Sequence, residues 1–286
     1  MPELPEVETV VADLRPHLVG MRITACDLRF PSIVRHPEPP LFVLGVSGRT
    51  IEALTRRGKY ILIHLGTPRA APGPQAEDGT ELLVVHLGMT GQLRYVEADA
   101  PLMNHTHAVF DLDSGAQLRF RDPRRFGRLL FGTARELAAG RKIPLLGPEP
   151  IDPEFTARDL FQRLRGRRAP IKAMLLDQRV MAGVGNIYAD ESCFRARVRP
   201  DRPAGGLSRR AVGRLHAALR DALLQGIVNR GSSISDYVDA WGGKGSQQEA
   251  LQVYGQAGRP CPNCSRPLSL VRLAGRSTVF CRRCQR

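Results

Sequence analysis

The chain opens with Met1-Pro2-Glu3-Leu4-Pro5-Glu6-Val7-Glu8. Beyond this opening, apolar residues recur at alternating spacings of three and four, and the series consists of Leu4, Val7, Val11, Leu14 and Leu18. Gly20 follows the last of them. This spacing predicts an amphipathic helix that buries one apolar stripe and ends near the glycine. Such a helix would hold Pro2, Glu3 and Glu6 at its N-terminal end.

Pro2 and Glu3 form a candidate catalytic pair. If Met1 is removed, Pro2 presents a secondary amine, and an α-amino group titrates near pH ~7.7 to 8.0, so that a neutral, nucleophilic fraction exists at physiological pH. Glu3 supplies a proton donor beside it. The alternative is a purely structural role, because proline is tolerated in the first turn of a helix and glutamate stabilises its positive end.

The net charge of +14 is unevenly distributed. Residues 1–150 hold 18 Lys and Arg against 17 Asp and Glu, whereas residues 151–286 hold 24 against 11. A basic excess in one part of a chain points to a polyanionic partner, most often nucleic acid. A GC-rich genome would explain arginine in place of lysine, but it would not explain the missing acids. With no signal pattern and no apolar run near the ~18 residues of a membrane span, we expect a soluble cytoplasmic protein.

Between Met21 and Gly132 the pattern changes to short runs rich in β-forming residues, separated by turns. The expected strands are 22–30, 41–46, 50–54, 60–65, 81–87, 92–96, 108–112, 117–120 and 128–131. Many short strands with frequent turns predict an antiparallel sandwich or barrel. Residues 67–80, rich in Pro, Ala and Gly, predict a surface loop.

The second half of the chain has a helical pattern. A proline-rich stretch at 145–153 predicts a linker. Farther on, Ser208 is a candidate N-cap, and Leu207 and Val212 on either side of it can form a hydrophobic staple. An apolar stripe follows, made of Leu215, Leu219, Ala222 and Leu223. The basic half is therefore expected to be a helical module.

Four cysteines near the end form two CxxC knuckles. Cys261 and Cys264 are followed, after sixteen residues, by Cys281 and Cys284. Four thiolates at this spacing predict one tetrahedral zinc ion, and the segment between them predicts a β-hairpin. The zinc should be structural, because no coordination position is left open for a substrate. Two disulfides are the alternative, which a cytosolic setting disfavours.

Two glycine-flanked turns carry side chains suited to a DNA base stack. Met89 lies in His86-Leu87-Gly88-Met89-Thr90-Gly91, and Arg124 and Phe126 lie in Asp122-Pro123-Arg124-Arg125-Phe126-Gly127. An apolar wedge accompanied by arginine is typical of proteins that extrude a nucleotide, although core methionines are commoner than exposed ones. Lys59, at a turn before a strand, could reach a phosphate or shuttle a proton, or simply be solvated.

Two further features suggest phosphate contacts. In Gly183-Val184-Gly185-Asn186-Ile187-Tyr188, glycines lead into a helical pattern, so that backbone N–H groups and Asn186 could hold a phosphate. The motif fails as a dinucleotide fingerprint, since no strand precedes it. Arg276 lies within the predicted zinc hairpin, in the most basic third of the chain.

Taken together, these motifs resemble the bacterial formamidopyrimidine-DNA glycosylase family, which removes oxidised purines from DNA and cleaves abasic sites. The resemblance covers essentially the whole chain and rests on motifs in the family's order: residues 2–9, Lys59, residues 86–91, 122–127, 183–188 and 251–255, and the four cysteines. The related endonuclease VIII group usually has glycine where this chain has Leu4, which favours the purine-specific branch.

The resemblance implies an α+β, multidomain architecture. Residues 1–147 are expected to form an N-terminal helix plus a two-layered antiparallel β-sandwich, residues 148–250 a helix–two-turn–helix DNA-binding domain, and residues 251–286 a four-cysteine zinc finger with a C-terminal β-hairpin. It also implies one structural zinc ion per chain, a monomer, and double-stranded DNA with oxidised or abasic sites as the partner, which would associate the protein with the nucleoid.

The resemblance also implies roles for single residues. Pro2 would attack C1′ of the damaged nucleotide, displace the base and form a Schiff base, with Glu3 protonating the sugar as it opens. The family associates Lys59 and Arg276 with phosphate contacts and with proton transfer in β,δ-elimination. The remaining implied DNA contacts are Met89, Arg124 and Phe126, which would fill the vacated stack, and His105, Arg167, Lys172 and Asn186, which would hold the DNA.

One departure leaves the lesion preference open. After Gly243-Lys244 the family commonly continues with proline, glycine and aromatics and caps the extruded base there, whereas this chain reads Gly245-Ser246-Gln247-Gln248. A glycosylase for oxidised pyrimidines of the endonuclease VIII type is therefore a rival. A non-catalytic zinc-finger DNA-binding protein is another. It would explain the charge and the cysteines, but not Pro2 and Glu3 opening an anchored helix.

Overall fold

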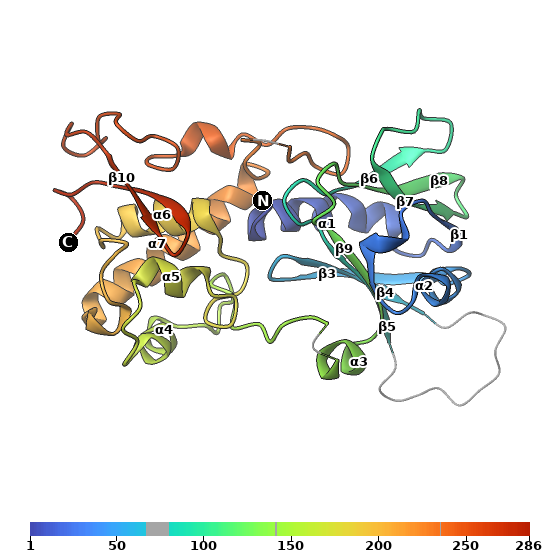
Figure 1. The fold of residues 1–286 in the computed structure, drawn as a ribbon, viewed down its shortest axis with the longest axis horizontal. Coiled ribbons are helices and arrows are strands. Elements are labelled where there is room, and N and C mark those ends of the chain that lie inside the picture. Colours follow the sequence, from blue (N-terminus) through green and yellow to red (C-terminus); the bar gives the residue numbers. More distant parts are fainter. Residues whose placement is uncertain (67–79, 141, 235) are drawn as a thin grey trace. The chain divides into compact units, whose positions relative to one another are not determined.

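The computed structural model describes residues 1–66, 80–140, 142–234 and 236–286. The chain divides into two compact units: unit 1 comprises residues 1–145 and 230–245, and unit 2 comprises residues 146–229 and 246–286 (Figure 1). The surface loop predicted at 67–80 lies outside the described residues except for its last one. Within the described ranges, no helix combines the length and the apolar character needed to cross a membrane.

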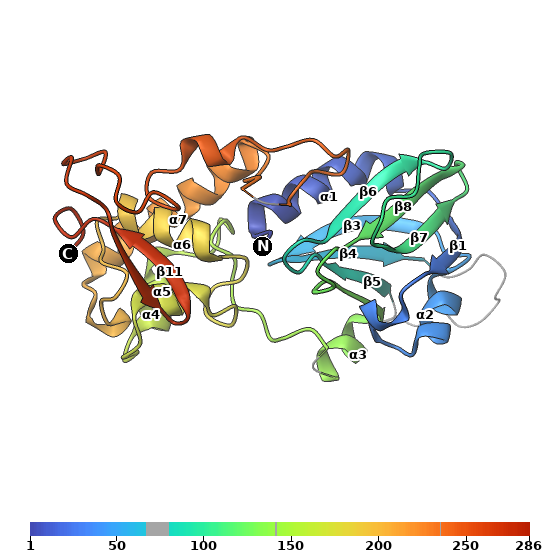
Figure 2. The ribbon, with the colours of Figure 1, turned by 45° about the horizontal axis from the view of Figure 1, so that its top comes forward.

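Two sheets form the sandwich of unit 1. The first has the strand order β1 (Ile23–Leu28), β7 (Thr106–Leu112), β8 (Ala116–Arg121) and β6 (Gln92–Glu97). The second has the order β2 (Val34–His36), β9 (Arg128–Thr133), β5 (Glu81–His86), β4 (Tyr60–Leu65) and β3 (Ile51–Arg57). Among these described strands, all pairs are antiparallel except β2 with β9, which is parallel. Figure 2 shows the two layers, and they confirm the predicted sandwich.

Helix α1 (Leu4–Leu18) contributes its apolar stripe to the core of this sandwich. Val7, Val11, Leu14 and Leu18 are fully buried and belong to one cluster with residues of both sheets. Gly20, with φ of +91°, then turns the chain in a conformation that favours glycine. The helix predicted from the three-and-four spacing is therefore confirmed, and its N-terminal end carries Pro2 and Glu3.

One predicted strand is wrong. Residues 41–46 lie in helix α2 (Pro39–Val46), which begins with two prolines at positions where the missing N–H groups cost nothing. A short run of consecutive apolar residues has no periodicity that separates a strand from a buried helix. Helix α3 (Ala134–Ala139) covers part of the outer face of the second sheet, where Leu137 packs with Leu82, Val84 and Leu130.

Unit 2 is built from four helices. They are α4 (Ala157–Leu164), α5 (Ile171–Leu176), α6 (Asn186–Arg195) and α7 (Arg209–Val228), with short 3₁₀ turns at Pro31–Ile33 in unit 1 and at Ala204–Gly206 and Gln247–Ala250 in unit 2. The Ser208 hydroxyl accepts the Ala211 N–H at 3.3 Å, as predicted for the N-cap of α7. Between α5 and α6, the Gln178 side chain accepts the Gly183 N–H and donates to the Val184 carbonyl, which fixes the connection.

The predicted hairpin between the cysteine knuckles also belongs to unit 2. Strands β10 (Ser269–Leu273) and β11 (Arg276–Phe280) are joined by Ala274 and Gly275, both with positive φ, as a two-residue turn requires. The Val279 N–H donates to the Asp190 carboxylate of α6 at 3.1 Å. The hairpin therefore packs on α6 rather than forming a unit of its own.

Residues 230–245 group with unit 1, whereas the expected helical domain extended from residue 148 to residue 250. They leave α7 and pack in unit 1, where Tyr237 and Ala240 join the sandwich core. The hydrogen bonds that hold them join residues more than 200 positions apart, such as the Ser232 N–H with Glu6. Contacts of this kind, between distant parts of the chain, group the segment with unit 1.

Candidate functional site

The N-terminal end of α1 is held by the Glu6 carboxylate. Pro2 and Glu3 are both buried, Glu3 being 2% exposed, and Glu6 is 1% exposed. One Glu6 oxygen accepts the Glu3 N–H at 2.8 Å, and the other accepts the Ser232 N–H at 2.8 Å. A single carboxylate thus fixes both the residue next to Pro2 and the returning segment 230–245. The sequence placed Glu6 at this end of the helix but gave it no role of its own, although an acid three residues after an N-cap is a known signal.

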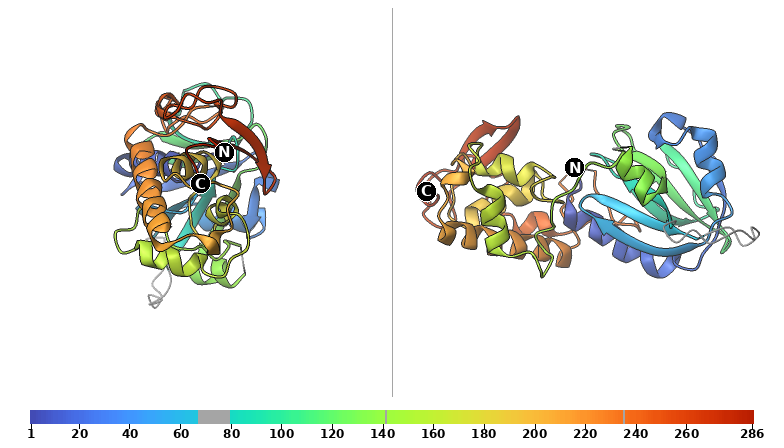
Figure 3. Two further views of the ribbon diagram at one scale, coloured as in Figure 1. Left: turned by 90° about the vertical axis from the view of Figure 1, so that its left-hand side faces the viewer. Right: turned by 90° about the horizontal axis from the view of Figure 1, so that it is seen from below.

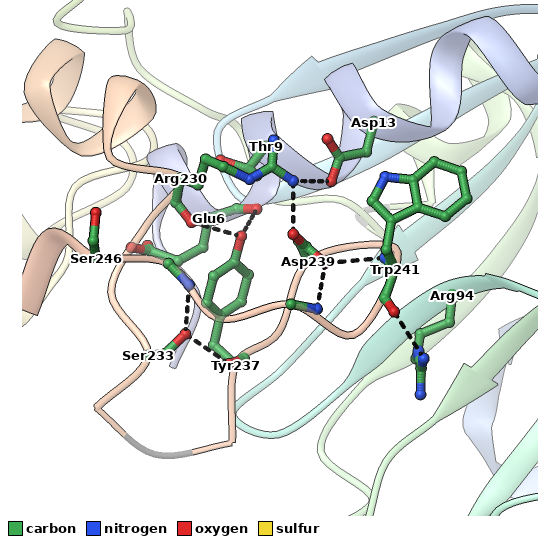
Figure 4. A network of polar contacts seen from close by, with 12 residues as sticks. Glu6, Thr9, Asp13, Arg94, Arg230, Ser233, Tyr237, Asp239, Trp241 and Ser246 are labelled. Carbon is green, nitrogen blue, oxygen red and sulfur yellow. Dashed lines mark hydrogen bonds and ion pairs between the residues drawn. The ribbon is translucent and has the colours of Figure 1, made fainter.

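Arg230 closes the second contact between that segment and α1. Its guanidinium lies 2.7 Å from the Asp13 carboxylate and 2.6 Å from the Asp239 carboxylate (Figure 4). Burial raises the pKa of Asp239, but the hydrogen bonds from Arg230 and from backbone N–H groups outweigh it and lower the pKa overall. Asp239 therefore stays ionised at neutral pH, and the ion pair persists. The backbone of Arg230 has a φ of +57°, which is costly for a residue other than glycine.

Tyr237 completes this support. Its hydroxyl lies 3.3 Å from the Glu6 carbonyl and 3.2 Å from the Arg230 carbonyl. Ser233 accepts the Gly245 N–H at 3.0 Å, so that the two ends of the segment are joined (Figure 4). No local pattern in the chain indicated this arrangement, because every one of the contacts with α1 joins distant parts of the chain.

Lys59 lies near the same end of α1. It occupies the β3–β4 turn and is only 6% exposed. The guanidinium of Arg56, near the end of β3, pairs with Glu8 of α1 at 2.7 Å, and the β3–β4 turn lies beside the N-terminal end of α1 in Figures 2 and 3. The structure therefore places the Lys59 turn beside the end of α1 that carries Pro2 and Glu3.

His86 is a further residue of this region that sequence reasoning left out. Burial, followed by the nearby charges of Lys59 and Arg128, lowers the pKa of His86 to about 4. Its Nδ1 accepts the Gly88 N–H at 3.2 Å, which leaves the proton of the neutral ring on Nε2. His86 is thus a neutral hydrogen-bond donor beside Lys59. The sequence feature that could have pointed to His86 is its position as the first residue of the motif 86–91.

The side chains predicted to enter a base stack gather around buried Asp122. Its carboxylate accepts hydrogen bonds from the Thr90 hydroxyl and from the Gly127 N–H, which ties the β5–β6 turn to the β8–β9 turn. Met89 is half-buried on the first turn, and Phe126 is 51% exposed on the second. The Arg124 guanidinium lies over the Phe126 ring at 4.9 Å.

His105 belongs to the same group of loops. It is exposed, and its carbonyl accepts the Asp122 N–H at 3.0 Å. Its φ of +67° lies in the left-handed region. Met89, His105, Arg124 and Phe126 therefore come from three loops that share one buried anchor, which gives a rigid base to an exposed cationic and apolar surface.

In unit 2 the structure brings Asn186 and Arg276 together. Asn186 begins α6, and its side-chain amide donates to the Ser277 carbonyl at 3.2 Å, next to exposed Arg276. Arg167 is exposed between α4 and α5. These positions allow contact with phosphates.

Lys172 corrects the expectation that it holds DNA. Its side chain is 0% exposed, and its ammonium lies 2.6 Å from the Asp190 carboxylate. It also donates to the Ser277 carbonyl and the Thr278 hydroxyl, each at 2.8 Å. Lys172 therefore fastens the hairpin to α5 and α6 and cannot reach a phosphate. The sequence could not reveal this ion pair, because a lysine in a basic region is normally expected to be exposed to solvent.

The motif 251–255 has a similar structural explanation. The Glu191 carboxylate accepts the N–H groups of Gln252, Val253 and Tyr254 at 2.9 to 3.1 Å. Backbone N–H groups in such a row can bind an anion, and here a buried side chain of α6 occupies them. The segment is thereby anchored to α6.

The four cysteines fit one zinc ion. The sulfurs of Cys261, Cys264, Cys281 and Cys284 all lie within 4.8 Å of one another, and none of these residues is in a disulfide. The Cys261 and Cys284 sulfurs are 3.9 Å apart, and the Cys264 and Cys281 sulfurs are 3.5 Å apart. Tetrahedral zinc with bonds of about 2.3 Å requires sulfurs about 3.8 Å apart. The geometry therefore suits a closed, structural site.

Three domain families match this chain. Residues 1–129 match the formamidopyrimidine-DNA glycosylase N-terminal domain, residues 146–238 match the formamidopyrimidine-DNA glycosylase H2TH domain, and residues 258–286 match the zinc finger found in FPG and IleRS. A formamidopyrimidine-DNA glycosylase of Moorella thermoacetica is 51% identical over 272 residues, which cover 95% of both chains.

Solved structures give the same result. A Lactococcus lactis FPG mutant in complex with DNA containing Fapy-dG superimposes with a TM-score of 0.88 at 32% identity, over 100% of both chains. The wild-type Lactococcus lactis protein in complex with DNA containing an oxidised pyrimidine gives a TM-score of 0.87, also at 32% identity and over 100% of both chains.

Proposed function

Because the chain belongs to the formamidopyrimidine-DNA glycosylase family, we propose that it removes oxidised purines, such as 8-oxoguanine and formamidopyrimidines, from duplex DNA and nicks the strand at the resulting site. The observation that carries this proposal is the buried Pro2–Glu3 pair at the start of α1. Glu6 holds that pair through the Glu3 N–H at 2.8 Å, beside the turn that carries Lys59.

Pro2 is the nucleophile of the proposed reaction. Once Met1 is removed, the amine attacks C1′, the bond from C1′ to the base breaks, and the base leaves with the proton that the amine gives up. The sugar ring then opens as Glu3 gives a proton to its oxygen, which leaves an iminium Schiff base on Pro2. The hydrogen bonds of Glu6 fix the backbone at Glu3, so that both groups face the same carbon without reorganisation.

Lys59 and Arg276 act on the phosphates and in the β,δ-elimination that cuts the strand. His86, as a neutral donor beside Lys59, adds a hydrogen bond without adding charge. Met89, Arg124 and Phe126 fill the space of the extruded nucleotide, and their support on Asp122 explains how they keep their place when the stack opens. His105, Arg167 and Asn186 hold the backbone.

Zinc bound by the four cysteines would stabilise the loops from which the hairpin projects, and so the position of Arg276. The protein is proposed to act as a monomer in the cytoplasm, associated with the nucleoid. Its partner is double-stranded DNA with oxidised or abasic sites, which the excess of basic residues in 151–286 favours.

A second candidate is excision of oxidised pyrimidines. It is favoured by the departure at residues 245–248 and by the complex of the Lactococcus lactis relative with DNA containing an oxidised pyrimidine. Leu4, at a position where the endonuclease VIII group usually has glycine, favours the purine branch.

The test compares cleavage of three duplexes, which carry an oxidised guanine, an oxidised pyrimidine or no lesion. We expect the first to be cut fastest and the last to remain intact, and Glu3→Gln to lose excision while still binding the duplex. Faster cleavage of the oxidised pyrimidine would support the second candidate. Binding without any cleavage would instead support a non-catalytic DNA-binding protein.

A further inference from the structure

A basic cavity of about 730 Å³ lies in unit 2, away from every residue assigned above except the cysteines. Five arginines line it: Arg197, Arg202, Arg214, Arg283 and Arg286. The other lining residues are Val198, Ala211, Asn263, Cys264 and Cys284, so that no carboxylate side chain is among them. Its volume lies in the range of cavities that hold a small ligand.

These arginines have no acidic partner among the residues that the structure describes. Arg214 donates only to the Ala196 carbonyl at 3.0 Å, and Arg202 only to the carbonyls of Gly206 at 3.3 Å and Arg286 at 3.5 Å. By contrast Arg199, in the same stretch, is paired with Asp201 at 2.6 Å. Arginines that serve only as a solvated surface gain nothing from facing one cavity, whereas several bound phosphate groups would offset their charges.

Zinc does not balance this charge. A tetrathiolate zinc site carries a charge of about −2, and two of its sulfur ligands, Cys264 and Cys284, reach the cavity wall. Even if a carboxylate at Arg286 is counted as well, the five guanidinium groups leave a positive excess. The thiolates therefore account for only part of the arginine cluster.

The cavity lies at the other end of α6 from the phosphate contacts proposed above. Asn186 begins α6 and bonds the hairpin beside Arg276, whereas the cavity adjoins Arg197, just past the last residue of the helix. A helix of ten residues is about 15 Å long. In Figure 2 the turn of the hairpin lies away from the C-terminus, and Arg286 at that terminus lines the cavity. One phosphate cannot contact both ends.

We propose that this arginine cavity binds phosphate groups of a nucleic-acid strand, as a second anion site beyond the one that serves excision. Guanidinium groups match phosphate oxygens in pairs, and several arginines around one cavity suit adjacent phosphodiesters. An acidic peptide is the less suitable ligand, because Val198 and Ala211 are the only aliphatic lining residues and offer few apolar anchors.

The test uses the full-length, zinc-loaded protein saturated with a duplex that carries a tetrahydrofuran abasic-site analogue. A fluorescent undamaged 12-nucleotide single strand is then titrated in. We expect a second binding event in the wild type, at least tenfold weaker in Arg197→Gln/Arg283→Gln. The slope of log affinity against log salt should also fall in magnitude by about 1.4, which corresponds to two lost phosphate contacts.

The matched control is Arg135→Gln/Arg210→Gln, which removes two exposed arginines outside the cavity and should bind like the wild type. Inorganic pyrophosphate should compete with the strand, and decaglutamate should not. Several results would overturn the proposal: a stoichiometry of one DNA per protein, equal affinity in the cavity variant and the control, equal competition by decaglutamate, or loss of zinc in the cavity variant. The last would show that the arginines serve the thiolates. None of these readouts requires excision, so they stand apart from the proposed activity.

Discussion

Replacing Lys172 with methionine tests how the hairpin of unit 2 is held. The Lys172 ammonium lies 2.6 Å from Asp190 and donates to Ser277 and Thr278 at 2.8 Å, with the Lys172 and Asp190 side chains 0% and 1% exposed. The methionine side chain is nearly as long as that of lysine, but Lys172→Met leaves the buried Asp190 carboxylate without its cation. We expect unit 2 to lose stability and the hairpin to lose its fixed position.

The magnitude follows from that burial. Removing one partner of a buried ion pair costs about 3 to 5 kcal/mol. Burial already raises the pKa of Asp190 to about 6 while the charge of Lys172 acts to lower it. Without Lys172 the pKa would rise further, and protonation near neutral pH would limit the loss to the lower part of this range. Lys172→Met/Asp190→Leu should recover most of it, because apolar pairs often replace buried ion pairs at little cost.

The two units can be followed separately in a urea titration. Trp241 is the only tryptophan and belongs to unit 1, so that its fluorescence reports on that unit. Circular dichroism at 222 nm reports mainly on unit 2, which holds 44 of the 73 α-helical residues described, and the longest helix, α7. With a slope of about 1 to 3 kcal/mol per molar urea, Lys172→Met should move the helical midpoint down by about 1 M or more and leave the Trp241 midpoint in place.

Lys244→Met, at an exposed lysine, is the control and should change neither midpoint. The contrary outcome is that Lys172→Met keeps the wild-type helical midpoint and instead lowers the salt dependence of DNA binding by the amount of one phosphate contact. That pair of results would mean that Lys172 contacts DNA after all.

Three other predictions concern the zinc site, the orphan base and His86. Cys264→Ser should lose zinc and bind DNA more weakly while the Trp241 unfolding transition stays unchanged, and full zinc content with normal binding would contradict the structural role. Wild-type protein should excise oxidised guanine well opposite cytosine and poorly opposite adenine, because Arg124 can donate to cytosine acceptors. Arg124→Ala should narrow that ratio, a bidentate contact being worth about 1 to 3 kcal/mol, and an unchanged ratio would exclude Arg124 from reading the base. Because burial lowers the pKa of His86 to about 4, the unfolded chain binds a proton between pH 4 and 6.5 that the folded chain does not, so stability falls as the pH falls through this window. Between pH 6.5 and 4.5 the wild type should lose about 2 kcal/mol more of its free energy of unfolding than His86→Asn, as measured by urea titrations followed by Trp241 fluorescence. An equal loss in both proteins would show that His86 is not buried in neutral form.

Much of the fold could be predicted from local pattern. The three-and-four spacing from Leu4 to Leu18 identified α1, Ser208 marked the start of α7, and the cysteine spacing indicated the zinc loops. These features depend on residues close together in the chain, where periodicity and capping act directly. The error at 41–46 shows the limit of this approach, because a short apolar run fits a strand and a buried helix equally well.

The supports of the site could not be predicted in the same way. Glu6, Arg230 and Asp13 each look like solvated charges in the sequence, and their roles arise only when residues 230–245 return to α1. Lys172 was misassigned for the same reason, since its partner Asp190 and the hairpin are brought to it by tertiary packing. A catalytic role for the chain's first residues could be proposed from the sequence, whereas the contacts that hold those residues in place required the folded structure.

The central claim is that the amine of Pro2 performs the reaction. Borohydride should trap a covalent complex between the protein and DNA with an oxidised guanine, and the crosslinked peptide should begin at Pro2. Protein that retains Met1 should give no such complex, because the proline nitrogen is then in an amide. A crosslink that maps to Lys59, or trapping that is unaffected by retained Met1, would contradict the account.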